Sequence, residues 1–543
     1  MLKRSTCLIC FVLALFLAAD VHAADLTRAK AAGHSVRSAP ADGAGGALST
    51  SARGLVFNEA QDRQVNQKST ALTPDGNGRN DAGGSVGDSD PPINIHLTWN
   101  DNSTDTTMVI TWATLTDVET VVKYGLTESY DSQRTGSSVW SSACRQYIHT
   151  VKLTGLAPVT PYHYCCGSSA GGFSEDFMFT TGVPAGGSER FIFSIGGDSR
   201  NPDDTTPNPT YAAYRISVMN TILSCQPQFA IHLGDIPNRG QYQPQWDEIF
   251  DNLKPQFTTM PYMPCWGSHG DPHQAQNAFD QFVLPLNGTG AGKEEYYSFD
   301  YGKVHFTVLY ALWGDSRILP GSPQYKWLEH DLNKASYNPK IEWKFVCIHS
   351  PPYSTATRSA GGSNLGLRSD ICPMLDQYKV DIVFTAHEHH FERTHLIRND
   401  TKVQDVPSGS GLVDPNGRIY YISGGLGGPV NPADGNEWFS AHHANVRHFL
   451  LVDVNDMTVN VKAIAEDLTL VDELTMSKSP TASEKTQPPP RRLGGLPMSK
   501  SPTAIFPRSK AVSIRNLILA CPARPIPLRQ RLCRGEWPRH SRY

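Results

Sequence analysis

The most constraining feature of the sequence is a series of apolar, β-branched segments that each run into an aspartate or a histidine. Asp198 ends the segment FIFSIGGD, Asp235 ends FAIHLGD, His349 ends KFVCIH, and His387 and His389 follow DIVFTA. Helix-like stretches separate these segments, so the pattern predicts an α/β sandwich with the sheets inside and the helices outside. The carboxyl ends of the strands in such a fold meet at one crevice, so these side chains are expected to share a site.

The side chains in this set indicate metal chemistry. Carboxylates and imidazoles together suit borderline and hard divalent metals and Fe(III). An aspartate can bridge two ions, and such a pair holds a phosphate ester, lowers the pKa of bound water and stabilises an in-line displacement. Any single histidine of the set could instead be an ordinary core residue; the recurrence at successive strand ends favours a shared site. The set therefore predicts hydrolysis of phosphate esters by the domain at residues 190–474.

A second domain precedes it. Residues 91–184 contain short alternating or β-branched segments separated by turn residues at fairly regular spacing, which predicts a fibronectin type III-like all-β sandwich. Trp99, Trp112 and Tyr162 are expected in its core rather than in a ligand site.

The two flanks differ from these domains. Residues 24–90 hold few large apolar side chains and are expected to be a disordered linker. Residues 475–543 hold 14 Lys and Arg against 2 Asp and Glu, and are rich in Pro, which predicts a basic disordered tail.

The rest of the chain holds 34 Lys and Arg against 50 Asp and Glu. This acidic body argues against nucleic acid as a partner, because phosphate contacts need basic side chains.

The N-terminus carries an export signal pattern. Lys3 and Arg4 precede the apolar run Cys7–Ala19, and Ala23 offers a small residue for cleavage, so residues 1–23 are predicted to be a signal peptide. The run is too short to span a bilayer, so no membrane span is expected. The protein is therefore expected to be secreted, or to reside in the endomembrane lumen.

Other residues bear on the same expectation. Asn102, Asn287 and Asn399 begin glycosylation sequons, which fit a secreted glycoprotein. Removal of the signal peptide would leave nine of the eleven cysteines, an odd number. Cys144 with Cys165 or Cys166 is one pairing that the sequence allows, and the sequence does not choose among the pairings.

The strand-end residues resemble the motif blocks of the purple acid phosphatases, within the calcineurin-like metallophosphoesterase superfamily. That family has the blocks DxG, GDxxY, GNH followed by Glu or Asp, VxxH and GHxH, in this order. The matching segments are Asp198-Ser-Arg200, Gly234-Asp235-Ile-Pro-Asn238, Gly267-Ser268-His269-Gly270, Val346-Cys-Ile-His349 and Ala386-His387-Glu-His389. The segments HFERT, YYSFDYGKVHF and ISGGLGG also resemble the family, and the resemblance covers roughly residues 91–474.

The resemblance implies a role for each matching residue. Asp198, Asp235 and His389 would hold a first metal, and Asp235 would bridge to a second held by Ser268, His349 and His387. The cofactors would be two metal ions, Fe plus Zn or Mn. His269 would lie near the substrate and stabilise the transition state or protonate the leaving group, a role suited to an imidazole. The alternative for His269 is a hydrogen-bonded supporting residue.

Four positions depart from the family pattern. Asn238 replaces the tyrosine whose phenolate binds Fe(III) and gives the family its colour, so no purple colour is expected. Ser268 replaces a metal-binding asparagine, which is expected to weaken the second metal. Gly270 replaces an acidic residue, and Asp271 or His273 is a hypothetical substitute. Arg200 replaces a glycine. Arginine cannot bind a metal, but its guanidinium suits a phosphate group, so Arg200 is expected to hold the phosphate of the substrate. A surface ion pair is the alternative role for Arg200.

The leading interpretation is an enzyme, a secreted acid phosphatase-like metallophosphoesterase that hydrolyses phosphate monoesters on small phosphorylated substrates. A phosphodiesterase or nucleotide hydrolase on the same fold is the first alternative, because the metal ligands do not choose between the two. A catalytically weakened homologue that acts as a binding protein is the second, motivated by the substitutions above. The oligomeric state stays open.

Overall fold

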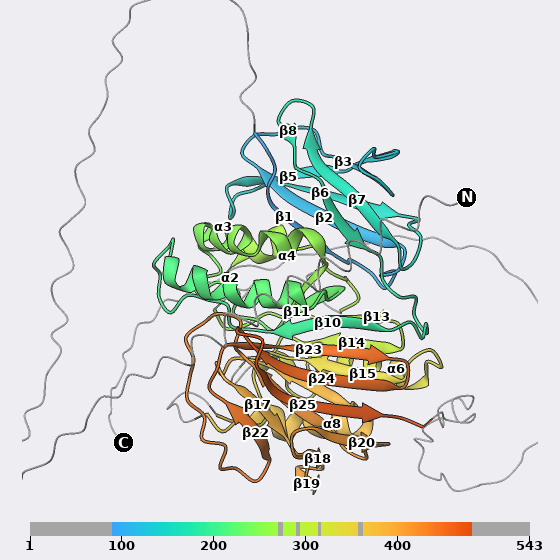
Figure 1. Ribbon diagram of the computed structural model, residues 1–543, viewed down its shortest axis with the longest axis vertical. Coiled ribbons are helices and arrows are strands. Elements are labelled where there is room, and N and C mark those ends of the chain that lie inside the picture. The colour runs from blue at the N-terminus through green and yellow to red at the C-terminus, as the bar shows by residue number, and fades with distance from the viewer. Residues whose placement is uncertain (1–89, 270–274, 289–293, 313–315, 357–361, 480–543) are drawn as a thin grey trace, which may run out of the picture. The chain divides into compact units, whose positions relative to one another are not determined.

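We analysed a computed structural model of the chain, which describes residues 90–269, 275–288, 294–312, 316–356 and 362–479 (Figure 1). The expected signal peptide, all of the expected linker except Asp90, and the expected tail beyond Ser479 lie outside the described residues. So do Gly270, Asp271 and His273. None of the helices in the described ranges is long and apolar enough to cross a membrane.

The N-terminal domain is an antiparallel β-sandwich, as its alternating sequence predicts. One sheet has the order β1-β2-β6-β5 and the other the order β4-β3-β7-β8, with β9 also paired to β7. The strands are β1 Ile93–Thr98, β2 Thr107–Thr114, β3 Val121–Gly125, β4 Ser132–Thr135, β5 Ser137–Ser141, β6 Gln146–Thr154, β7 Pro161–Ser168, β8 Gly172–Phe173 and β9 Phe177–Thr180. Trp99 and Trp112 are buried, and Tyr162 is partly buried and stacks on Phe179.

The sandwich domain shares its core with the second domain through β1. Trp99 packs edge-on against Phe229. The hydroxyl of Thr98 donates to the carbonyl of Val283 across 2.7 Å, and the amide of Asn94 donates to Asp247 across 2.7 Å. These contacts join residues far apart in the sequence, so the two domains form one packed body in this region.

The second domain contains two facing sheets. In the first sheet the order is β12-β11-β10-β23-β24-β25-β20, and in the second it is β13-β14-β15-β16-β21-β17-β22. The strands of the first are β10 Phe191–Gly196, β11 Phe229–His232, β12 Tyr262–Pro264, β20 Ser410–Val413, β23 His448–Asn455, β24 Thr458–Ala465 and β25 Leu470–Ser477. Those of the second are β13 Tyr297–Tyr301, β14 Val304–Val308, β15 Trp343–Cys347, β16 Ile382–Thr385, β17 Phe391–Thr394, β21 Ile419–Ser423 and β22 Ser440–Ala444; β18 Leu396–Arg398 and β19 Thr401–Gln404 form a separate hairpin.

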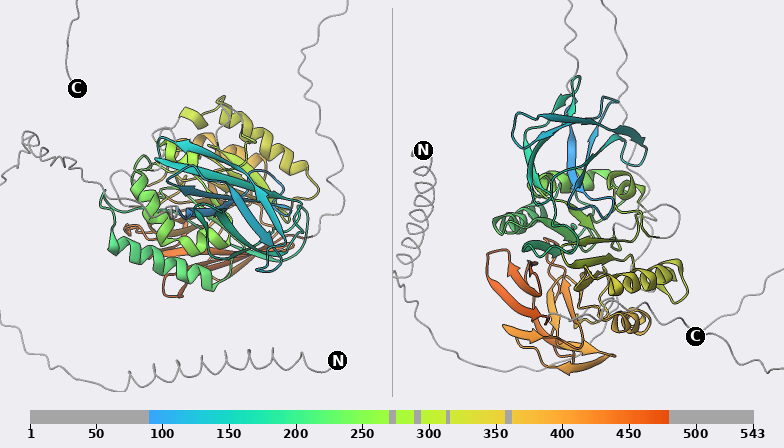
Figure 2. Two further views of the ribbon diagram at one scale, coloured as in Figure 1. Left: turned by 90° about the horizontal axis from the view of Figure 1, so that it is seen from above. Right: turned by 90° about the vertical axis from the view of Figure 1, so that its right-hand side faces the viewer.

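Aromatic side chains fill the space between the two sheets. Phe193 from β10 lies edge-on to Phe306 of β14 and to Phe384 of β16, with ring centroids 5.2 and 6.4 Å apart. Helices cover the outer faces (Figure 2). They are α2 Pro209–Ser224, α3 Gln243–Asn252, α4 Lys254–Thr259, α5 Gln276–Gln281, η1 Ser316–Ile318, α6 Pro323–Tyr337, α7 Leu365–Asp370 and α8 Cys372–Gln377. The expected α/β sandwich is thereby confirmed.

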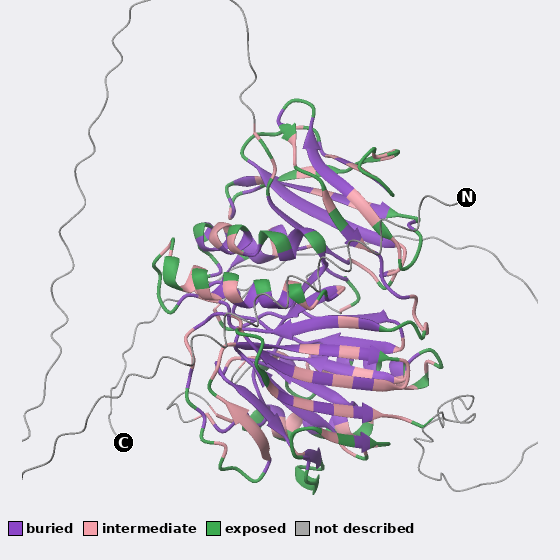
Figure 3. Cartoon of the chain, in the orientation of Figure 1, coloured by how far each residue is buried: buried purple, intermediate pink, exposed green. Residues whose placement is uncertain are grey.

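Burial along the strands shows how the layers form. Strands β14 and β16 are buried at every residue, whereas β24 and β25 alternate between buried and partly exposed positions (Figure 3). The alternation arises because successive side chains of a strand point to opposite faces. Strand β25 ends at Ser477, so residues 475–477 belong to this sheet and not to the expected tail.

Candidate metal centre

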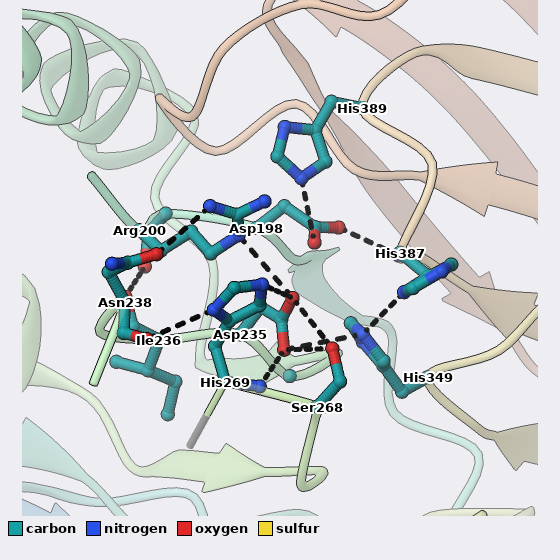
Figure 4. Close-up of polar contacts among 12 residues, drawn as sticks. Asp198, Arg200, Asp235, Ile236, Asn238, Ser268, His269, His349, His387 and His389 are labelled. Atoms are coloured by element: carbon teal, nitrogen blue, oxygen red, sulfur yellow. Dashed lines mark hydrogen bonds and ion pairs between the residues drawn. The ribbon is translucent and has the colours of Figure 1, made fainter. Parts of the chain in front are cut away.

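Five strands deliver the predicted site residues to one crevice (Figure 4). Asp198 follows β10, Asp235 follows β11, and His349 follows β15. Ser268 and His269 follow β12, and His387 and His389 follow β16. Strands β10, β11 and β12 run parallel to one another, as do β15 and β16, so their carboxyl ends lie at the same edge of each sheet.

The backbone at three of these residues is unusual. Asp198, Asp235 and His387 have φ values of 63°, 57° and 71°. A left-handed conformation is uncommon for residues other than glycine, and it persists where the surrounding structure enforces it. His387 and His389 are not part of a strand, because β16 ends at Thr385 and both residues follow it. The positive φ of His387 nevertheless lets both imidazoles reach the crevice.

His349 is held with one nitrogen facing the site. Its Nδ1 donates to the carbonyl oxygen of Leu233 across 2.7 Å. Its Nε2 lies 3.4 Å from Oδ1 of Asp235 and 3.2 Å from Nδ1 of His387. A carbonyl oxygen can only accept, so the proton of a neutral His349 is on Nδ1, and Nε2 presents a lone pair to the crevice.

His389 and Asp198 repeat this arrangement on the other side. The Nδ1 of His389 donates to the carbonyl oxygen of Pro429 across 2.5 Å, and its Nε2 lies 3.2 Å from Oδ1 of Asp198. The other carboxylate oxygen, Oδ2, accepts the backbone N–H of His387 across 2.8 Å. Oδ1 is buried and accepts no hydrogen bond from the described residues.

Asp235 lies at the centre of the group. Its Oδ1 accepts the backbone N–H of His269 across 2.9 Å, and the hydroxyl of Ser268 lies 3.3 Å from both of its oxygens. Its Oδ2 faces Nε of Arg200 at 3.5 Å and Nε2 of His269 at 4.0 Å. The side chain is 2% exposed, so this carboxylate is buried among polar groups from several elements.

The electrostatics follow from this burial. Burial alone would raise the pKa of Asp235, but the nearby His349 outweighs it and holds that pKa well below its usual range. Burial alone would likewise lower the pKa of His349, but the Asp235 carboxylate outweighs it and raises that pKa to about 9. Burial and then the neighbouring His349 lower the pKa of His387 to about 4, and the opposing effect of the Asp198 and Asp235 carboxylates is smaller.

The donor set fits divalent metal ions. Nε2 of His349 lies 3.2 Å from Nδ1 of His387 and 3.4 Å from Oδ1 of Asp235, so two imidazole nitrogens and a carboxylate oxygen converge, and these are ligands that borderline divalent metals accept. Donor atoms of Asp235, His349 and His387 all lie within 4.8 Å of one another. The carbonyls of Leu233 and Pro429 fix the imidazoles as carbonyl partners do for metal-bound histidines.

Two features support the site: the first could not be predicted from the sequence, and the second lies in a segment that the sequence marked only by its family resemblance. The carbonyl partners of His349 and His389 carry no side-chain signal, so sequence patterns could not reveal them. The glycines of the ISGGLGG segment are the second feature: a Cβ at Gly424 would lie 2.3 Å from the carbonyl oxygen of Glu388 and 2.7 Å from Oδ2 of Asp198. That segment follows β21, so its position after a strand was the available signal.

Comparison with known proteins gives the same picture. Residues 92–181 match the purple acid phosphatase N-terminal domain, and residues 211–391 match the calcineurin-like phosphoesterase domain. The chain is 30% identical to purple acid phosphatase 23 of Arabidopsis thaliana over 314 residues, which is 53% of this chain and 64% of that protein. It is 26% identical to acid phosphatase type 7 of Danio rerio, over 71% of this chain and 91% of that protein.

A solved structure shares the fold. The purple acid phosphatase PPD1 from yellow lupin (Lupinus luteus) seeds superposes with a TM-score of 0.63 at 20% identity, covering 74% of this chain and 77% of that one. The chain thus combines a region that matches the purple acid phosphatase N-terminal domain with one that matches the calcineurin-like phosphoesterase domain, and it resembles the purple acid phosphatases in sequence.

Proposed function

We propose that this protein is a secreted metal-dependent phosphatase that hydrolyses monoesters on small phosphorylated substrates at a site for two metal ions. The observation that carries the proposal is the convergence of two buried carboxylates and three imidazoles from four strand ends around Asp235. The acid phosphatases among its relatives support the same activity.

The ligands divide between two positions. Asp198, Asp235 and His389 would hold one ion, while Asp235, Ser268, His349 and His387 would hold the other. The ions, Fe plus Zn or Mn in this proposal, would supply Lewis acidity and a metal-activated water at neutral or acidic pH. The chain's own residues then have to bind the phosphate, orient it and move a proton.

His269 is placed for the proton. Its Nδ1 donates to the carbonyl oxygen of Asn238 across 3.0 Å, so Nε2 faces the crevice beside Asp235. The side chain is 37% exposed, which leaves it accessible to a substrate. Burial lowers the pKa of His269, so its protonated form is a stronger acid toward a leaving-group oxygen. The alternative of a purely supporting role for His269 is tested by His269→Ala.

Arg200 is placed for the phosphate. Its side chain is 13% exposed and lies beside Asp235 at the edge of the crevice. A guanidinium there can donate two parallel hydrogen bonds to a phosphate. The alternative role is that of an ion pair, and Nε of Arg200 lies 3.5 Å from Oδ2 of Asp235.

The deciding experiment measures hydrolysis of p-nitrophenyl phosphate by the full chain supplied with Fe, Zn or Mn, beside its Asp235→Ala variant. Asp453→Ala is the matched control, because Asp453 pairs with the exposed Arg190 and lies opposite Ile192 near the start of β10, whereas Asp198 follows the end of that strand. We expect metal-dependent activity in the wild type and the control, and a loss of about a hundredfold or more in Asp235→Ala. Equal rates in all three would overturn the proposal and favour a binding protein.

The same assay separates the two hydrolytic alternatives. Bis(p-nitrophenyl) phosphate replaces the monoester at equal concentration. A higher kcat/KM for the monoester supports the phosphatase, whereas a higher value for the diester supports a phosphodiesterase.

A further inference from the structure

A cation of the protein itself occupies one side of the metal site. Arg200 reaches toward Asp235, with Nε 3.5 Å from Oδ2, and Nε is buried and makes no hydrogen bond to the described residues (Figure 4). The guanidinium therefore shares an oxygen that the carboxylate would otherwise offer to an ion.

Asn238 holds Arg200 in this position. Its Oδ1 accepts a hydrogen bond from Nη1 of Arg200 across 3.1 Å, and its Nδ2 donates to Asp204 across 3.1 Å. The carbonyl oxygen of Asn201 accepts a second bond from the same Nη1. The side chain of Asn238 is thus engaged at both ends, and its oxygen points at a guanidinium rather than into the crevice.

The two oxygens of Asp235 consequently face different surroundings. Oδ1 lies 3.4 Å from Nε2 of His349, which itself lies 3.2 Å from Nδ1 of His387. Oδ2 lies next to the positive charge of Arg200. An ion held by Asp198, Asp235 and His389 would share the Asp235 carboxylate with the guanidinium, and like charges repel strongly in a buried site.

We propose that the two metal positions are unequal, because Arg200 weakens the position formed by Asp198, Asp235 and His389. The position formed by Asp235, His349 and His387 fills first. The replacement of a metal-binding asparagine by Ser268 would by itself predict the reverse order, because Ser268 belongs to the position formed with His349 and His387. The inference rests on the proposed function only for the existence of the site, and metal binding is measured without any substrate.

The test is equilibrium dialysis of the metal-free chain against increasing free Mn²⁺, with bound metal counted per chain. We expect two steps, with the second at a free Mn²⁺ concentration about tenfold or more above the first. The variant Arg200→Met keeps most of the side-chain volume without the charge. In this variant the free Mn²⁺ concentration of the second step should fall by about tenfold, toward that of the first step.

Matched variants identify the positions and the cause. Arg239→Met removes a nearby positive charge that pairs with Asp204 and does not touch Asp235, and it should keep the two steps apart. His389→Ala should remove only the second step, and His387→Ala should weaken the first. A single step in the wild type, or an unchanged separation in Arg200→Met, would overturn the inference. Neither outcome depends on phosphatase activity, so failure of the proposed function would be seen separately.

Discussion

His349 donates its Nδ1 proton to the carbonyl oxygen of Leu233 across 2.7 Å, and this hydrogen bond turns Nε2 toward Asp235. The two residues lie 116 positions apart in the sequence and follow neighbouring sheets. The contact therefore joins the two sheets and orients a predicted metal ligand at the same time.

This contact predicts that His349→Ala changes both stability and metal content. The Leu233 carbonyl would be left buried without a partner, which costs about 1–3 kcal/mol of unfolding free energy. Urea unfolding and metal analysis of the purified variant measure the two effects. His330→Ala, an exposed position on α6, is the control and should change neither. Wild-type stability together with full metal content in His349→Ala would contradict the assigned geometry.

The colour of the iron-loaded protein tests the role of Asn238. An amide cannot give a tyrosinate-to-iron charge-transfer band, and its oxygen is engaged with Arg200. We therefore expect no strong visible band in the wild type. The double variant Asn238→Tyr, Arg200→Gly should gain one, because it supplies a phenol and removes the competing cation. A strong tyrosinate band in the wild-type absorption spectrum would show that another tyrosine reaches the metal.

A buried group formed by Asp300 and His305 of the second sheet and Asp331 of α6 predicts a loss of stability at alkaline pH. Nδ1 of His305 lies 2.6 Å from Asp300, and Nε2 lies 3.0 Å from Asp331. Burial would lower the pKa of His305, but the carboxylates of Asp331 and Asp300 outweigh it and raise the pKa to about 10. The unfolded value is about 6.5. The stabilisation is therefore complete below about pH 6.5 and is lost as the pH rises through about 10.

The measurement is the unfolding free energy at several values of pH between these limits, for the wild type and His305→Gln. The wild type should lose about 2–5 kcal/mol more than the variant across this range. His330→Gln serves as the exposed-histidine control and should follow the wild type. Parallel pH dependences for wild type and His305→Gln would refute the prediction.

The described cysteines predict slow thiol chemistry. Cys144, Cys165, Cys166, Cys225, Cys265, Cys347 and Cys372 are unpaired, so the structure forms no bridge between Cys144 and Cys165 or Cys166. All but Cys225 are buried, and burial raises the pKa of Cys372 to about 11. A thiol reacts as its thiolate, so these positions should be labelled slowly by iodoacetamide at pH 8.

Peptide mapping by mass spectrometry measures how fast each of these cysteines is labelled. Cys225 should be labelled before Cys265 and Cys347, which should react only after unfolding in urea. Disulfide-linked peptides among these positions in the native protein, or immediate labelling of Cys265, would be the contrary result.

Much of the candidate site could be predicted from the sequence, because the signal is local. An apolar strand followed by Asp198, Asp235 or His349 is visible in a short stretch of residues. A polar residue directly after such a strand indicates a site at the strand end. The predicted boundary at residue 474 falls inside β25, which continues to Ser477 through pairing with β24 and β20. Strand pairing of this kind is decided by distant partners rather than by local composition.

The sequence by itself therefore determined the two-domain order, the strand-and-helix pattern and the set of candidate metal-binding side chains. Only the tertiary structure decided how these side chains are used. The carbonyls of Leu233 and Pro429 select which nitrogens face the crevice, and Asn238 directs Arg200 onto Asp235. These contacts are made between segments that come together only on folding, and backbone carbonyls are the same at every residue. No local pattern could reveal them, because their effect depends on position in space.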